Sequence, residues 1–220
     1  MNNIKAVIFD LDNTILDRTI TFNKFAMTFA AKYFPHLNDR ENIIRRIIEL
    51  DEDGYKNRNK LFEELVEELP WNKKPKSFEL LKYFDDHFVS NASIMEHARE
   101  VIQITREKYK IGIITNGRSK IQYGKIEQLG IRNLFDFIIV SEEAGFQKPN
   151  VRIFELAIEG LGMRPEECLY IGDHPINDIE GAGMAGMETI WIEVNHPWKT
   201  EITIKPKHKI KRLSDLVGIL

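Results

Sequence analysis

Acidic residues follow two of the strand-like runs in this sequence. "KAVIF" leads directly into "DLDNT", and "LYI" leads into "GDHPIND". Four carboxylates stand at these positions: Asp10, Asp12, Asp173 and Asp178. Because close carboxylates repel one another, they stay ionised together only if a cation compensates them. A hard divalent cation with oxygen ligands suits such a set, and Mg²⁺ fits better than zinc because no cluster of His or Cys accompanies the acids.

Hydrogen-bond donors follow two further runs. Thr115 and Asn116 come at the end of "IGII", and Lys148, followed by Pro149, comes after the run Phe137 to Val140 and a loop. Thr115 and Asn116 could simply cap the next helix, a role compatible with holding phosphate at its amino end. With a metal and a second carboxylate, these donors favour attack by an aspartate on a bound phosphoryl group.

The elements that carry these residues alternate in type. From about residue 93, the runs 111–115, 137–140, 169–171 and 189–194 read as strands, and 94–108, 119–129, 151–163 and 176–185 read as helices. Residues 5–9 belong to the same class of buried strand. This pattern predicts an α/β fold with a doubly wound, mostly parallel, Rossmann-like sheet, in which ligands lie beyond the carboxyl ends of the strands. The tail, "HKIKRLSDLVGIL", predicts a short edge strand and a closing helix.

Residues 18–90 differ from the rest of the chain. Their apolar residues recur at three- and four-residue spacing and predict about four helices. We therefore expect an α/β core of residues 1–17 and 91–220, interrupted by an inserted helical domain of residues 18–90.

Composition narrows the possible partners. The 220 residues carry a net charge of −3, which does not favour binding to nucleic acid or to an anionic membrane. No apolar run approaches the roughly 18 residues of a membrane span, and the single cysteine fits a reducing compartment. We expect a cytoplasmic protein.

Four motifs of this sequence resemble those of the haloacid dehalogenase-like hydrolase superfamily: "DLDNT", "ITNG", "KP" and "GDHPIND". The resemblance extends to their order, their spacing and their placement at strand ends. They extend from residue 9 to residue 186, and the helical insert occupies the position of that superfamily's small α-helical cap. The dehalogenases that named the superfamily lack a carboxylate at the position of Asp12. The resemblance is therefore to the phosphatase branch.

This resemblance implies a role for each residue. Asp10 would attack phosphorus and bind Mg²⁺, and Asp12 would act as general acid and base, with its backbone carbonyl on the metal. Thr115 and the amide group after it, at Asn116, would hold the phosphoryl oxygens, and Lys148 would balance charge. Two further residues complete the metal site: Asp173 as a ligand, and Asp178 as a ligand through water or a support. A helix-capping role for Asp178 stays open.

The expected activity is that of a Mg²⁺-dependent phosphomonoester hydrolase acting through an aspartyl-phosphate. Its substrate would be a small phosphorylated metabolite, with a sugar phosphate or a nucleoside monophosphate as the first choice. The alternatives are a phosphomutase of the same fold and a non-catalytic protein that binds a phosphorylated ligand. We also expect the cap to move about linkers near residues 16–18 and 89–93.

Overall fold

The computed structural model describes residues 3–220, which form two compact units. The larger unit contains the chain up to Asp17 together with Ile94–Leu220, and the smaller unit is Arg18–Ser93. The helical insert expected at 18–90 therefore extends to residue 93 in the structure.

The larger unit is built on a six-stranded sheet in which every neighbouring pair is parallel. The strands are β1 (Ala6–Phe9), β2 (Lys110–Thr115), β3 (Phe137–Val140), β4 (Cys168–Gly172), β5 (Glu188–Ile192) and β6 (His208–Ile210). Their order is β3-β2-β1-β4-β5-β6, so the chain runs outward from β1 in both directions. The predicted α/β fold class is confirmed.

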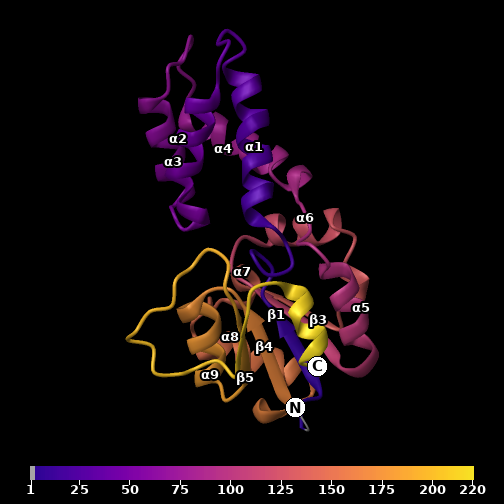
Figure 1. The fold of residues 1–220 in the computed structure, drawn as a ribbon. Coiled ribbons are helices and arrows are strands. Elements are labelled where there is room, and N and C mark those ends of the chain that lie inside the picture. Colours follow the sequence, from indigo (N-terminus) through magenta and orange to yellow (C-terminus); the bar gives the residue numbers. More distant parts are fainter. Residues whose placement is uncertain (1–2) are drawn as a thin grey trace. The chain divides into compact units, whose positions relative to one another are not determined.

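Helices cover both faces of this sheet (Figure 1). They are α5 (Ala98–Lys108), α6 (Ser119–Gln128), α7 (Ser141–Ala144), α8 (Val151–Leu161) and α9 (Gly181–Met184), with a π-helix, η5 (Pro175–Glu180). Short 3-10 segments are η3 (Arg132–Leu134), η4 (Pro165–Glu167) and η6 (Leu213–Gly218). On one face α8 packs Phe154 and Ile158 against Ile8 and Tyr170 in a single buried cluster. Strands buried on both faces must be apolar at successive positions, which explains the continuous run in β1.

Several boundaries differ from the sequence prediction. The helix expected at 94–108 begins only at Ala98, because Ile94 forms an antiparallel bridge with Leu16 and Met95 donates its backbone N–H to Ile15 at 2.7 Å. The helix expected at 176–185 is divided between η5 and α9. The closing helix of the tail is the 3-10 segment η6.

The smaller unit is entirely helical within the part of the chain described. It contains α1 (Arg18–Tyr33), α2 (Glu41–Asp51), α3 (Arg58–Glu68) and α4 (Ser77–His87), with the short segments η1 (Glu52–Gly54) and η2 (Val89–Asn91). Aromatic rings fill its core: Phe25 meets Phe84 edge-on with centroids 5.2 Å apart. Near its C-terminal end, the backbone N–H of Ser93 donates to Oγ1 of Thr21 at 3.0 Å. The unit thus has a core of its own.

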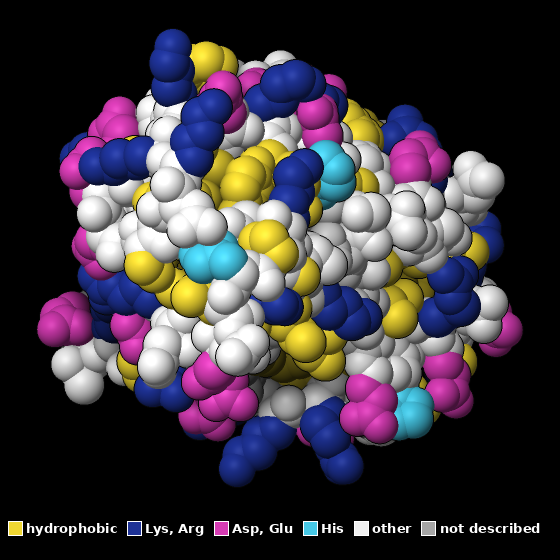
Figure 2. All heavy atoms as spheres, turned by 90° about the horizontal axis from the view of Figure 1, so that it is seen from above, with side chains coloured by type: hydrophobic (Ala, Val, Ile, Leu, Met, Phe, Trp, Pro, Cys, Tyr) yellow, Lys and Arg dark blue, Asp and Glu magenta, His cyan; other side chains and the backbone are white. Residues whose placement is uncertain are grey.

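The surface carries charges of both signs. On the face drawn in Figure 2, lysine and arginine side chains are interspersed with aspartate and glutamate, in keeping with the small net charge. Among the described residues, no helix is long and apolar enough to cross a membrane.

Candidate active site

The carboxyl ends of β1, β2 and β4 lie side by side in the middle of the sheet. Phe9, the last residue of β1, is in register with Ile113 of β2 and Ile171 of β4. The next residue, Asp10, donates its backbone N–H to Ile171 at 2.8 Å. The polar residues that follow these strands are therefore delivered to one edge of the sheet, where doubly wound folds bind ligands.

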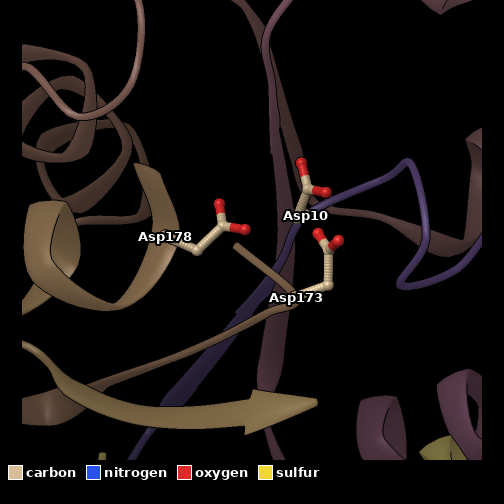
Figure 3. A group of neighbouring side chains, drawn as sticks. All are labelled: Asp10, Asp173 and Asp178. Carbon is tan, nitrogen blue, oxygen red and sulfur yellow. The ribbon is translucent and has the colours of Figure 1, made fainter. Parts of the chain in front are cut away.

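Three of the four predicted acids meet at this edge: Asp10, Asp173 and Asp178. Each offers a carboxylate oxygen that lies within 4.8 Å of an oxygen of the other two. All three are buried, with 6%, 3% and 1% of their surface exposed. Figure 3 shows their carboxylates turned toward a shared space, from the end of β1, the end of β4 and η5. Three oxygen donors without sulfur or nitrogen in the group suit Mg²⁺.

Lys148 supplies the positive charge inside this group. Its Nζ atom lies 2.5 Å from Oδ1 of Asp10, 2.6 Å from Oδ1 of Asp178 and 3.0 Å from the hydroxyl of Tyr170. Burial alone lowers the pKa of Lys148, but the charges of Asp10 and Asp178 outweigh it and raise that pKa overall. The side chain is therefore an ammonium group at neutral pH.

One lysine does not balance three buried carboxylates. Burial raises the pKa of Asp10 to about 7; Lys148 acts in the opposite direction, while the charge of Asp178 adds to the rise. With all three carboxylates ionised, Lys148 leaves two excess negative charges, which match the charge of one divalent cation, so the donor set and its charge fit Mg²⁺.

Asp178 is held by the chain through both of its oxygens. Oδ1 accepts from Lys148 and lies 3.1 Å from the Tyr170 hydroxyl, and Oδ2 accepts the backbone N–H of His174 at 2.9 Å. Residue 172 is glycine because a Cβ there would overlap the carboxyl group of Asp178. The residue that caps η5 is His174 rather than Asp178. Nδ1 of His174 accepts hydrogen bonds from the backbone N–H groups of Ile176 and Asn177.

Tyr170 was not singled out by the sequence analysis. It lies inside β4, fully buried, and its hydroxyl contacts both Lys148 and Asp178. Burial and the neighbouring carboxylates raise its pKa well above the usual value, so it stays a protonated phenol. A tyrosine within the apolar run "LYI" reads as core, and nothing in its spacing marks it as part of the site.

Asn116 fixes the backbone of Lys148. Its side-chain nitrogen donates to the carbonyl of Lys148 at 3.0 Å, and its side-chain oxygen accepts the N–H of Lys148 at 2.8 Å. The side chain of Asn116 is thus engaged through both its nitrogen and its oxygen, and the two bonds hold the loop at Lys148 against the end of β2. Thr115 is buried beside it, with its hydroxyl in contact with Gln122.

Asp12 is not a member of the carboxylate group. Its two oxygens each lie 2.8 Å from Nζ of Lys125, and Nε2 of Gln122 donates to Oδ2 at 2.9 Å. Both partners lie on α6, on the face turned inward, and neither was singled out from the sequence. A lysine on the apolar face of a helix pattern was the signal that could have pointed to them, because a buried lysine needs a charged partner.

Known proteins resemble this chain over most of its length. Residues 7–192 match the family of haloacid dehalogenase-like hydrolases. The glyceraldehyde 3-phosphate phosphatase of Methanopyrus kandleri is 31% identical over 196 residues, 86% of this chain and 84% of that protein. The pyrimidine 5'-nucleotidase YjjG of Escherichia coli is 38% identical over 125 residues, 56% of this chain and 55% of that protein.

A solved structure extends the comparison to the whole fold. The HAD-hydrolase YfnB of Bacillus subtilis, in a crystal form bound to magnesium, superposes with a TM-score of 0.80 at 25% identity. The match covers 99% of each chain. The family match over residues 7–192 agrees with the order of the strands and with the acids at their ends. This chain therefore belongs to the haloacid dehalogenase-like hydrolase family.

Proposed function

We propose that this protein is a Mg²⁺-dependent phosphomonoester hydrolase that acts through a phosphorylated Asp10. The observation that carries the proposal is the position of Asp10. It is buried at the end of the central strand, with Lys148 at 2.5 Å and Asp173 and Asp178 beside it. The relatives named as a phosphatase and as a 5'-nucleotidase support the same reaction class.

Each step of the reaction has a residue to perform it. A carboxylate oxygen of Asp10 attacks phosphorus, the bond from phosphorus to the leaving oxygen breaks, and Asp12 gives that oxygen a proton. Water then attacks the aspartyl-phosphate, Asp12 takes its proton, and the bond between phosphorus and Asp10 breaks to release phosphate. Asp10, Asp173 and the carbonyl of Asp12, with Asp178 in support, would hold Mg²⁺, which would supply positive charge against the carboxylates and the phosphoryl oxygens.

Donors from the chain hold the phosphoryl group. The hydroxyl of Thr115 and the backbone N–H of Asn116 stand at the end of β2, next to β1 in the sheet. Lys148 keeps Asp10 oriented and offsets its charge, and Asn116 keeps Lys148 in place through its paired hydrogen bonds. Preorganised donors of this kind stabilise charge that develops in the transition state.

The substrate is a small phosphorylated metabolite. A three-carbon sugar phosphate is the first choice, because a glyceraldehyde 3-phosphate phosphatase matches 86% of this chain, and a pyrimidine nucleoside monophosphate is the second. The smaller unit, Arg18–Ser93, acts as a cap that controls entry, since it is inserted between Asp12 and the rest of the site in the sequence. Hydrogen exchange at residues 16–18 and 89–93 as slow as in β1 would argue against a moving cap.

The reaction is tested by phosphate release from glyceraldehyde 3-phosphate, hexose phosphates and pyrimidine nucleoside monophosphates, with Mg²⁺ and with chelator. We expect release that requires Mg²⁺ and disappears in Asp10→Asn, while the exposed Asp86→Asn keeps the wild-type rate. An isomeric sugar phosphate without free phosphate would instead identify a mutase. No turnover of any compound by folded protein would identify a non-catalytic binder and refute the proposal.

A further inference from the structure

Two buried polar side chains on α6 have no part in the reaction described above. Lys125 is 4% exposed and Gln122 is 2% exposed, three residues apart and therefore on the same face of the helix. A lysine is rarely buried unless it is paired, because removing an ammonium group from water carries a large free-energy penalty. Their burial calls for partners, and the partners are residues of the site.

Lys125 contacts Asp12 symmetrically. Its Nζ atom lies 2.8 Å from each carboxylate oxygen of Asp12 and 2.8 Å from Oε1 of Gln122. This fork fixes the plane of the carboxylate of Asp12, a residue that follows β1 and forms an isolated bridge with Leu16 rather than belonging to a strand or helix. The 22% of its side-chain surface that remains exposed leaves it accessible to a reacting group.

Gln122 connects Asp12 to Thr115. Its Nε2 atom donates to Oδ2 of Asp12 at 2.9 Å and contacts the hydroxyl oxygen of Thr115. The orientation of the amide is determined by Lys125, because a flipped amide would turn a second donor toward the ammonium group. One side chain therefore spans the general acid and base and a phosphoryl-binding residue.

We propose that Lys125 and Gln122 are positioning residues that align Asp12 with the phosphoryl group held at Thr115. The inference rests on the proposed function, in which Asp12 transfers a proton to and from oxygens on that phosphorus. Such a group works only within hydrogen-bond reach of the oxygen, and a displacement of about 1 Å can cost a factor of about 100 in rate. The bridge with Leu16 holds the backbone of Asp12, whereas the pair on α6 holds its carboxylate in that alignment.

The test compares two substrates that need Asp12 to different degrees. An alkyl phosphate such as glyceraldehyde 3-phosphate needs its leaving oxygen protonated, whereas p-nitrophenyl phosphate releases a stable phenolate. In Lys125→Met and Gln122→Met we expect kcat/KM to fall about 10- to 100-fold for the alkyl phosphate and less than about threefold for the aryl phosphate. Lys108→Met and Gln128→Leu, exposed on α5 and α6, are the matched controls and should stay within about twofold of wild type.

An equal loss on both substrates would overturn the proposal, because it would mean that the pair serves the phosphoryl group or the fold in general. No loss would overturn it as well. Gln122→Met changes no charge, so it keeps the test open if Lys125→Met does not fold.

The alignment is also measured without turnover. Crystal structures of wild type and Gln122→Met should show the Asp12 carboxylate rotated or in two conformers in the variant, and an unchanged carboxylate would contradict the proposal. If wild type hydrolyses neither substrate, the proposed function fails while these structures still decide whether the pair positions Asp12.

Discussion

The ammonium group of Lys148 lies 2.5 Å from a carboxylate oxygen of Asp10, across 138 positions of sequence. Both side chains are buried, and the same ammonium group also binds Asp178 at 2.6 Å. The contact joins the end of the central strand to the loop that precedes α8. It ties the stability of the larger unit to the same groups that we assign to catalysis.

Lys148→Met should therefore impair both stability and activity. Removing one partner of a buried ion pair leaves uncompensated charge, so without Mg²⁺ we expect the free energy of unfolding to fall by about 3–5 kcal/mol. Phosphate release should fall by about 100-fold or more. Urea unfolding and kcat provide the two measurements. Lys74→Met, which removes an exposed pair with Glu67, should change the free energy of unfolding by at most about 1 kcal/mol; similar effects of the two variants would contradict the assignment.

Mg²⁺ should stabilise the folded protein independently of any substrate. At a concentration of about 100 times its Kd, a ligand that binds only the folded state adds about 2.7 kcal/mol, which raises Tm by roughly 5–10 °C in a protein of this size. Calorimetry with Mg²⁺ and with chelator measures this shift. Asp173→Asn should lose most of it, whereas the exposed Asp86→Asn should keep it. A full shift in Asp173→Asn would exclude Asp173 as a ligand.

Gly172→Ala should disturb the site through packing alone. The added methyl group would overlap the carboxyl group of Asp178 and push it away from Lys148. Overpacking of this kind typically costs about 1–3 kcal/mol, and we expect phosphate release to fall as well. Gly218→Ala is the control, since nothing lies within 4 Å of a Cβ at that position. Wild-type stability and kcat in Gly172→Ala would show that Asp178 has room to move without consequence.

Glu167 should make stability depend on acid pH. Hydrogen bonds from the side chains of Arg164 and Lys5 hold its pKa at about 2, below the usual 4.5. Because the folded-state pKa is the lower one, the ionised group stabilises the fold above about pH 4.5, and this contribution is lost as the pH falls toward 2. The difference in urea midpoint between wild type and Glu167→Gln should thus shrink from pH 6 to pH 3. A constant difference for Glu167→Gln over this pH range would disprove the effect.

Strand positions were predictable because burial on both faces leaves a continuous apolar signature. The limits of β3 agree with the sequence prediction at both ends, and those of β1 and β2 each differ by one residue at the amino-terminal end. Helix beginnings were less predictable. Ile94 looks like a helix residue by spacing, but its pairing with Leu16 is a tertiary contact that periodicity does not encode.

The residues of the candidate site also fall into two groups, those that the sequence analysis found and those that it missed. Asp10 and Asp173 were found because they directly follow β1 and β4, whose carboxyl ends lie at one edge of the sheet. Lys148 was found from its place in the loop that follows β3 and α7. Tyr170 was not, because it lies inside an apolar strand run that reads as core. Gln122 and Lys125 were not, because the sequence analysis did not ask which residue a lysine on the apolar face of a helix would pair with. Lys125 is 113 positions from Asp12, and only the packing of α6 against the sheet brings the two together.

The bridge between Leu16 and Ile94 and the bond between Ser93 and Thr21 bring the two ends of the helical unit next to each other. The entropic cost of bringing the two ends of an insertion together grows only slowly with the length of the insertion. The length and internal sequence of the helical unit can therefore change while the sheet stays the same. The helical unit is therefore an insertion that can be exchanged without altering the sheet. Recombination at these two junctions could replace the helical unit in a single genetic event while leaving the sheet and the residues at its edge unchanged.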